Sequence, residues 1–249
     1  MKLENIIAKR SHKTIYRDDS LAIKVFDCDY SKADVLNEAL NHARVEETSL
    51  SIPSLHEVSM LDGKWAIVSD YIEGKTLDVL IKENPDKKEE YLTFFVNLQL
   101  QVHKQSCPLL GRLQDKMHRK ISLGDYDATT RYELHTRLSG MKKHSKLCHG
   151  DFNPKNIIVK EDGTAYIIDW AHATQGNASA DAAKTYLLFM LKGNKDFAEA
   201  YLDTFCKLSD IAKQYVQQWI PIVAASQSLE AKPEEVALLK TWVNVMDFQ

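Results

Sequence analysis

The chain has 249 residues, of which 44% are hydrophobic and 27% are charged, a balance typical of a globular protein with one large domain or two lobes. Its 32 basic and 35 acidic residues give a net charge of −3 without any basic block, which argues against nucleic acid and anionic membranes as partners. The N-terminus lacks a signal-peptide pattern and no apolar run reaches membrane-spanning length, so we expect a soluble, cytoplasmic protein.

The four cysteines are far apart in the sequence: Cys28, Cys107, Cys148 and Cys206. They form no Cys-x-x-Cys pair and no Cys/His cluster, which argues against a zinc site and a disulfide framework. We expect isolated, reduced thiols, with Cys148 buried and neutral.

Three short strands are predicted at the N-terminus, over residues 5–9, 14–18 and 20–26. The third contains Ala22-Ile23-Lys24. A lysine in a strand is usually solvated, so this lysine becomes a candidate only through its position just before a helix.

That helix is predicted over residues 31–47, with Ser31 as its N-cap. Its apolar face is expected to contain Val35, Leu36, Ala39, Leu40 and Ala43. We expect this face to pack against the sheet.

Glu38 falls within the apolar stripe of this helix. An unpaired buried carboxylate lowers stability by several kcal/mol, so Glu38 needs a cationic partner, and Lys24 is the natural one. Glu46 and Glu47, near the end of the helix, are the alternatives to Glu38.

Two more strands are predicted over residues 55–60 and 64–69, joined by Asp62-Gly63, and they complete a five-stranded antiparallel sheet. From Thr76 onward the apolar residues recur with helical spacing. The first long helical segment ends at His103, which we interpret as a packing or hydrogen-bonding residue. Later helices are predicted over residues 126–141, 178–191, 196–208, 211–227 and 233–246.

A short polar motif interrupts this helical half. His149-Gly150-Asp151 is followed by Asn156, five residues after the Asp, and by Asp169 at the end of an apolar run. Two β-type runs between Asn156 and Asp169 are split by Glu161-Asp162-Gly163, a strong hairpin signal. The hairpin is expected to bring Asn156 and Asp169 to the same end of its ladder, where one metal ion could bridge them.

The motif, from His149-Gly150-Asp151 through Asn156 to Ile168-Asp169-Trp170, resembles the aminoglycoside phosphotransferase and choline kinase family of the protein-kinase-like superfamily. The resemblance implies a bilobal α+β protein-kinase-like fold, with an N-terminal five-stranded antiparallel sheet and one helix, and a mostly helical C-terminal lobe. We place the nucleotide-binding lobe at residues 1–70 and the catalytic and acceptor-binding lobe at residues 71–249.

In the kinase catalytic loop an Asp accepts the substrate hydroxyl proton, while an Asn and a second Asp bind Mg²⁺. The resemblance therefore implies that Asp151 is the catalytic base and that Asn156 and Asp169 are metal ligands. Ala22-Ile23-Lys24 resembles the kinase strand whose Lys contacts the α- and β-phosphates, with Glu38 as its orienting partner.

The other nucleotide contacts follow from the same resemblance. Residues 69–74 resemble the interlobe linker, where backbone groups of Ser69 and Tyr71 would hydrogen-bond the adenine edge. The same residues are equally consistent with an ordinary strand-to-helix connection. The turn at residues 10–13 takes the place of the glycine-rich phosphate loop, and it contains no glycine. Ser11, Thr14 or local N–H groups could donate to phosphate there, and Lys13 could add charge.

A small acceptor is expected because only residues 170–177 separate Asp169 from the next helix and no Ala-Pro-Glu follows, so a peptide platform has no room. Protein kinases of the Ser/Thr type have a lysine two residues after the catalytic Asp, but here that position is Asn153 and the lysine of the loop is Lys155. This arrangement resembles the small-molecule branch. Asp181 resembles an Asp that caps the helix and orients this loop.

The acceptor itself stays open. From residue 174 to the end there are nine acids and seven lysines, which is not a strongly acidic lobe for aminoglycosides. A choline-like amine would need aromatic faces, which five residues could supply unless they form the core: Tyr186, Tyr201, Tyr215, Trp219 and Trp242.

We therefore expect an ATP- and Mg²⁺-dependent phosphotransferase that moves the γ-phosphate to a hydroxyl of an aminoglycoside-, choline- or sugar-like small molecule. GTP is a possible donor in place of ATP, and the oligomeric state is open. The alternative is a non-catalytic nucleotide-binding scaffold with a kinase-like fold, which the glycine-free phosphate loop favours.

Overall fold

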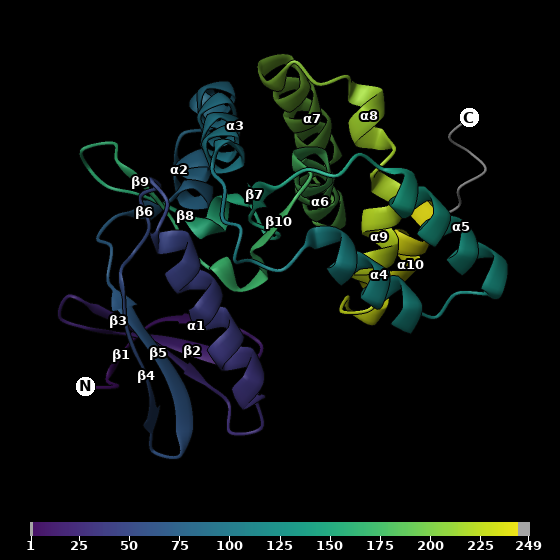
Figure 1. Ribbon diagram of the computed structural model, residues 1–249. Helices are drawn as coiled ribbons and strands as arrows, with labels where there is room; N and C mark the ends of the chain where they lie inside the picture. Colours follow the sequence, from purple (N-terminus) through teal and green to yellow (C-terminus); the bar gives the residue numbers. More distant parts are fainter. Residues whose placement is uncertain (1, 244–249) are drawn as a thin grey trace. The chain divides into compact units, whose positions relative to one another are not determined.

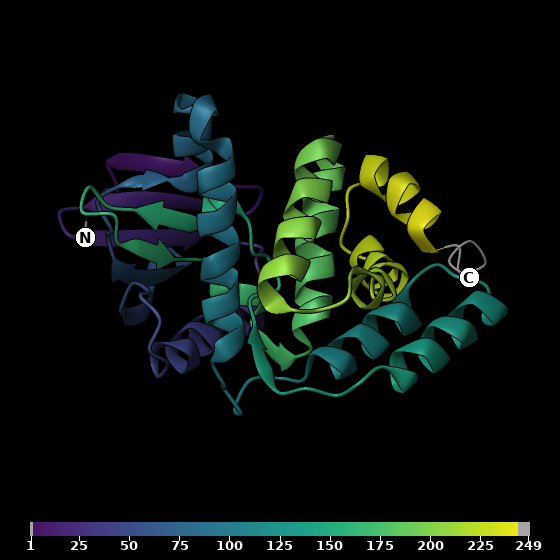
Figure 2. The same ribbon diagram turned by 90° about the horizontal axis from the view of Figure 1, so that it is seen from above.

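The computed structural model describes residues 2–243 of the chain (Figures 1 and 2). By packing, the chain divides into two compact units. The first unit runs from the N-terminus to Pro85 and includes Pro154–Ala173, and the second comprises Asp86–Asn153 and the residues from Thr174 onward. The predicted lobe boundary after residue 70 is a functional division, and it stays a prediction.

The first unit is built on a five-stranded antiparallel sheet with the order β1-β2-β3-β5-β4. Its strands are β1 (Asn5–Lys9), β2 (Lys13–Asp18), β3 (Leu21–Phe26), β4 (Leu55–Leu61) and β5 (Lys64–Asp70). This confirms the predicted sheet, with ends shifted by at most one residue. Asp62 and Gly63 both have positive φ in the β4–β5 turn, as the Asp-Gly signal requires.

Helix α1 (Lys32–Glu46) packs on one face of this sheet through a buried cluster of Phe26, Val35, Ala39 and Ile67. Its N-cap is Ser31, as predicted, because the Ser31 hydroxyl accepts a hydrogen bond from the Asp34 N–H.

The predicted apolar face of α1 was partly wrong. Leu36 and Leu40 are 44% and 47% exposed, whereas Glu38 and Val45 are buried. The buried positions of α1 are 35, 38, 39, 41 and 45, so the inward face is rotated away from the two leucines and carries Glu38 toward the sheet.

The rest of the first unit is a small three-stranded sheet and short helices. The elements are β6 (Lys75–Thr76), α2 (Leu77–Glu83), the 3₁₀ turns η2 (Pro154–Asn156) and η3 (Trp170–His172), β8 (Ile157–Val159) and β9 (Ala165–Ile167). The β8–β9 hairpin confirms the Asp-Gly prediction: Gly163 has a φ of 84°, and Asp162 Oδ1 accepts from the Thr164 N–H at 2.9 Å.

The second unit is mostly helical, with one two-stranded sheet of β7 (Lys146–Cys148) and β10 (Thr174–Gly176). Its helices are α3 (Lys88–Lys104), α4 (Leu113–Leu123), α5 (Ala128–Gly140), α6 (Ala178–Leu191), α7 (Lys195–Ser209), α8 (Lys213–Gln217), α9 (Ile220–Ser228) and α10 (Pro233–Val243). Helix α9 is buried over most of its length, and α4, α6 and α10 all pack against it. Together with the N-terminal sheet, this confirms the predicted α+β class.

Two features of the second unit differ from the prediction. Residues 211–227 form two helices, because Pro221 lacks an N–H and, in a continuous helix, its ring would clash with the carbonyl of Gln217, the last residue of α8. Helix α4 was not predicted, although Leu113, Met117 and Ile121 recur at four-residue intervals. The end of the predicted 233–246 helix lies outside the described residues.

Among residues 2–243, we find no helix that combines the length and the apolar composition needed to cross a bilayer. The four cysteines are free thiols, and Cys107 and Cys148 are buried. Burial raises the pKa of the Cys148 thiol well above its ordinary value, so this thiol is neutral at physiological pH, as expected from the sequence.

Candidate active site

The first unit contains a cavity of about 280 Å³ whose lining residues all belong to that unit. One part of the wall is apolar, with side chains from the sheet and the β8–β9 hairpin: Ile15, Ala22, Ile67, Ile158 and Ile168. The other part is charged and contains Lys13, Lys24, Glu38 and Asp169. A flat apolar group and a charged group therefore each find a matching surface in one cavity.

Lys24 lies at the centre of the charged part. Its Nζ donates to Glu38 and lies 3.2 Å from Asp169 Oδ1. Burial lowers the pKa of this ammonium, but Asp169 and Glu38 together raise it further, so its net pKa is above the ordinary value and Lys24 is charged. The Lys24–Glu38 contact is the one expected from a carboxylate buried on α1.

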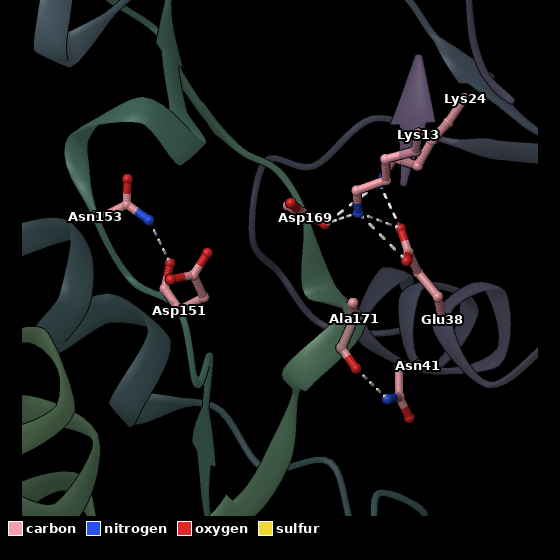
Figure 3. Close-up of polar contacts among 8 residues, drawn as sticks. All are labelled: Lys13, Lys24, Glu38, Asn41, Asp151, Asn153, Asp169 and Ala171. Carbon is pink, nitrogen blue, oxygen red and sulfur yellow. Dashed lines mark hydrogen bonds and ion pairs between the residues drawn. The ribbon is translucent and has the colours of Figure 1, made fainter. Parts of the chain in front are cut away.

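Lys13 joins the same cluster, which the sequence did not predict beyond a possible added charge. Its Nζ lies 3.3 Å from Asp169 Oδ1 and 3.5 Å from both carboxylate oxygens of Glu38. The register explains why: Ile15 on β2 pairs with Lys24 on β3, so Lys13, two residues earlier, points to the same face. Figure 3 shows both lysines directed toward the two acids.

Asn156 and Asp169 lie at the same end of the hairpin, as its predicted register required. The Ile168 N–H donates to the Asn156 carbonyl at 2.9 Å, and both Asn156 and Asp169 line the cavity. Asp169 has a left-handed backbone, with φ 66° and ψ 62°. The amide of Asn41 on α1 donates to the carbonyl of Ala171 at 3.1 Å and fastens the residues after Asp169 to α1.

The donor chemistry of this pair fits a hard divalent cation. Asp169 offers carboxylate oxygens and Asn156 an amide oxygen, the ligand types that Mg²⁺ accepts together with waters and substrate phosphates. Within the described residues there is no group of three His, Cys, Asp or Glu side chains that would form a dedicated protein cage. A metal held partly by a bound phosphate suits such a sparse donor set.

Of the other residues predicted to contact the nucleotide, some line the cavity and one does not. Ser69 and Tyr71 line the cavity, but the Tyr71 N–H donates to the Ser20 carbonyl at 2.7 Å and would have to leave it to meet an adenine edge. Ser11 is not among the described residues that line the cavity, whereas its neighbours Arg10 and Lys13 are. The Arg10 N–H donates to the Lys13 carbonyl at 2.8 Å, which closes this turn without glycine.

Asp151 belongs to the second unit, on the turn after β7. Gly150, with a φ of 79°, supplies the left-handed residue of this turn, and the Asp151 N–H donates to His149 Nδ1 at 3.2 Å. On the other side, Asn153 Nδ2 donates to the Asp151 carbonyl at 3.0 Å (Figure 3). The backbone of Asp151 is thus held by both neighbours.

Asp181 fixes this turn from α6. Its two carboxylate oxygens accept from the N–H groups of Gly150 at 2.8 Å and His149 at 3.2 Å, and His103 Nε2 lies 2.9 Å from Oδ2. Burial raises the pKa of Asp181, but the hydrogen bonds from His103 and the backbone lower it more, so the net pKa is below the ordinary value.

These contacts correct one expectation and confirm another. Asp181 does not cap its helix, because the N-cap of α6 is Asn177, whose side chain accepts from the Ser179 N–H. His103 is buried and hydrogen-bonded, as predicted.

A model of the phosphotransferase enzyme family matches residues 2–215, which is most of the chain. The chain belongs to this family. In a direct comparison with the sequences of curated proteins, nothing matched this phosphotransferase-family chain.

Solved structures of the same fold are similar to this family member over nearly its whole length. The apo form of a thermostable mutant of aminoglycoside phosphotransferase APH(4)-Ia has a TM-score of 0.69 at 13% identity, with 97% of this chain and 92% of that one covered. Choline kinase LicA from Streptococcus pneumoniae has a TM-score of 0.64 at 18% identity, with 98% and 92% covered. The type VIII aminoglycoside-3'-phosphotransferase has a TM-score of 0.61 at 15% identity, with 98% and 92% covered. At these identities the similarity shows the protein-kinase-like fold.

The aromatic residues considered for a quaternary amine mostly serve the core of this phosphotransferase-family protein. Tyr201 and Trp219 are fully buried and Tyr186 is 3% exposed. The Tyr201 hydroxyl donates to Gln99 at 2.5 Å, and the Tyr215 hydroxyl accepts from Asn177 at 2.8 Å. These rings therefore stabilise the helical packing.

Proposed function

We propose that this protein is an ATP- and Mg²⁺-dependent phosphotransferase that transfers the γ-phosphate to a hydroxyl group of a small molecule. The observation that supports it most is the charged cluster of Lys24, Lys13, Glu38 and Asp169 inside the cavity of the first unit, in a chain that belongs to the phosphotransferase enzyme family. Two of the similar solved structures contain ADP or AMP-PNP together with hygromycin B, which supports a nucleotide and a small molecule as ligands.

The proposed nucleotide contacts follow from the cavity. Lys24 contacts the α- and β-phosphates and Glu38 keeps its ammonium in place, since the carboxylate already accepts from Nζ. Lys13 supplies a second positive charge from β2, which offsets the missing glycine-rich loop, whose usual contribution is close backbone N–H groups. The adenine lies against the apolar wall near Ser69 and Tyr71.

Asn156 and Asp169 would hold Mg²⁺, which neutralises charge on the phosphate oxygens during transfer. Asp151 accepts the proton of the acceptor hydroxyl, and its turn is fixed by Asp181, which aligns this carboxylate before the acceptor arrives. Within the cavity, the Asp169 carboxylate that now accepts from Lys13 and Lys24 would be shared with the cation.

A non-catalytic nucleotide-binding scaffold is the second candidate. It is favoured by the glycine-free turn at residues 10–13 and by the Tyr71 N–H that is engaged with Ser20. It is disfavoured by the retention of Asp151, which a scaffold that only binds nucleotide does not need.

Thermal shift with ATP, with and without Mg²⁺, separates these candidates when it is combined with ADP release over a panel of hydroxylated small molecules. The proposed enzyme shows a Mg²⁺-dependent rise in Tm that Asp169→Asn removes, and turnover that Asp151→Ala removes while the Tm response to Mg·ATP persists. The scaffold shows the same rise without turnover for any acceptor. An Asp151→Ala protein with unchanged turnover would overturn the assignment.

A further inference from the structure

The second unit contains a cavity of its own, of about 360 Å³, and all of its lining residues belong to that unit. The walls come from the start of α4, the segment 142–145 before β7, residues 175–177 and Trp219, which precedes α9. A volume of this size is within the range of small-molecule sites. We call it the β7 cavity, because it lies at the start of that strand.

Positive charge dominates the exposed rim of the β7 cavity. Three permanent cations line it and are exposed: Arg112, Lys142 and Lys143. The only acid among the lining residues is Asp115. Within residues 2–243, none of the three cations makes a salt bridge or a side-chain hydrogen bond. An anion that enters the β7 cavity therefore meets positive charge that no carboxylate has already neutralised.

The imidazole of His144, which also lines the cavity, responds to the same charge. Burial and the charges of Lys142 and Lys146 lower the pKa of His144. No acid opposes this shift. The charge at the rim is thus positive also where a fourth side chain reports on it.

The buried side of the β7 cavity contains a hydrogen-bond donor without an acceptor. Its buried lining residues are Gly176, Asn177 and Trp219. Trp219 is fully buried, and its indole N–H has no acceptor among residues 2–243. A buried N–H without an acceptor is destabilising, and an indole can only donate. An oxygen of a bound ligand would satisfy it, so the indole and the rim cations favour the same ligand chemistry.

The backbone that carries the lysines of the rim is held in place by two side-chain amides. Gln114 Nε2 donates to the Met141 carbonyl at 3.2 Å, and Asn177 Nδ2 donates to the Lys142 carbonyl at 3.0 Å. These bonds connect the segment before β7 to α4 and to the N-cap of α6. A ligand therefore does not have to order this segment when it binds, which favours affinity.

The β7 cavity is separate from the turn that carries Asp151. Gly176 on β10 pairs with Lys146, the first residue of β7, so the cavity lies at that end of the strand. Asp151 follows the opposite end. A strand rises about 3.3 Å per residue, so the three residues of β7 place about 10 Å between the cavity and the turn. A ligand in this cavity is therefore not the hydroxyl group that Asp151 would deprotonate.

We propose that the β7 cavity binds a small organic anion, a compound with a phosphate or carboxylate group. The rim cations attract the anionic group, and the Trp219 N–H donates to one of its oxygens in a charge-assisted hydrogen bond. Leu113 and the Trp219 ring provide apolar surface for the body of the ligand. None of these residues takes part in the proposed phosphoryl transfer, so the site stands or falls independently of it.

The first test is titration calorimetry without nucleotide, at constant ionic strength, with phenyl phosphate, benzoate and benzamide. These three probes share a ring and differ in charge. At least one of the two anions should bind with 1:1 stoichiometry, at least about tenfold more tightly than neutral benzamide. The tighter of the two identifies phosphate or carboxylate as the preferred group. Equal binding of benzamide, or no saturable binding of either anion, overturns the proposal.

A pair of double variants locates the binding. Lys142→Met/Lys143→Met should weaken anion binding about tenfold or more, and both lysines are exposed, so the fold is expected to persist. The control, Lys195→Met/Lys207→Met, removes the same charge from two exposed lysines of α7 that do not line the cavity, and it should bind as wild type does. Unchanged binding in the first variant, or equal losses in both, overturns the proposal.

The indole N–H of Trp219 gives a direct spectroscopic signal. In a proton–nitrogen correlation spectrum its resonance should move downfield and saturate as the anion is added, whereas that of Trp65 in the first unit should stay. Trp219→Phe keeps an aromatic ring without the donor and should weaken binding several-fold. If this variant does not fold, the wild-type spectrum decides. A Trp219 resonance that does not respond to a bound anion overturns the proposal.

Discussion

The carboxylate of Asp181 accepts a hydrogen bond of 2.8 Å from the backbone N–H of Gly150, and so connects α6 to the turn that carries Asp151. The same carboxylate accepts from His103, which is buried at the end of α3. One acid thus joins two helices to the proposed catalytic turn. Its loss should affect stability and turnover together.

We expect Asp181→Asn to lower the free energy of unfolding by about 1–3 kcal/mol, because the new amide group would face a backbone donor and leave it unsatisfied. Urea denaturation measures this, and kcat should fall more than the KM for ATP changes. Asp203→Asn is the control, because Asp203 pairs with Lys213 on the surface at 2.6 Å and such pairs contribute about 0–1 kcal/mol. Equal stability of the two variants would contradict the role assigned to Asp181.

The stabilisation by Asp181 should depend on pH. The folded-state pKa lies below the ordinary value, mainly because the hydrogen bonds from His103 and Gly150 outweigh the opposing effect of burial. The contribution is therefore complete above about pH 4 and is lost as the pH falls through the lower folded-state value. Urea midpoints at pH 6 and pH 3 should show a difference between wild type and Asp181→Asn that shrinks on acidification.

Lys13→Met should raise the KM for ATP about tenfold, or ~1.4 kcal/mol, because one of the two ammonium groups near the proposed phosphate site is removed. Lys24→Met should raise the KM for ATP by more than Lys13→Met does, since it also leaves Glu38 buried without its closest cation. Steady-state kinetics with varied ATP measures both. Lys9→Met is the matched control: Lys9 is exposed, ends the neighbouring strand and does not line the cavity among the described residues. Identical effects of Lys9→Met and Lys13→Met would exclude a specific contact.

Lys184→Met should stabilise the protein at pH 7 in a buffer without phosphate, by roughly 1 kcal/mol or ~2–4 °C in Tm. Burial and the nearby Lys120 lower the pKa of Lys184 from 10.5 to about 8, so folding disfavours its charged form. This penalty is complete below pH 8 and fades as the pH rises toward 10.5, so the gain in Tm should shrink between those values. A gain that is independent of pH would point to packing alone, and Lys207→Met should show none.

Gly74→Ala should destabilise the first unit by about 1–3 kcal/mol, because a Cβ at Gly74 would lie 2.5 Å from the Val159 carbonyl oxygen and 2.9 Å from its carbon. Both contacts are backbone atoms of β8, so relief requires a shift of the small sheet that lines the cavity. Gly140→Ala is the control, since a Cβ there meets nothing within 4 Å. Thermal denaturation of the two variants compares them, and a stable Gly74→Ala protein with an unchanged KM for ATP would contradict the packing.

The sequence predicted the sheet and the hairpin well, because strand ends and Asp-Gly turns are local signals. The Lys24–Glu38 pair followed from one physical requirement, that a carboxylate on a buried helix face needs a cation. The predicted helix face included Leu36 and Leu40, which are exposed, because the apolar residues of α1 are compatible with more than one buried face.

What the sequence did not predict depends on tertiary packing. The register of β2 with β3 sets the inward direction of Lys13. Lys13 belongs to the charged cluster through its contact with Asp169, which is far away in the sequence. Helix α4 was not predicted, although its apolar residues recur with helical spacing.

The left-handed backbone at Asp169 limits how this position can be redesigned. Asp and Asn tolerate a φ of 66° better than other residues with a side chain. For Glu, the longer acid, the same conformation costs roughly 1–2 kcal/mol. Engineers who hope to change the preferred cation by lengthening this side chain to Glu will therefore perturb main-chain geometry as well as ligand reach. Asn is the substitution that alters charge alone.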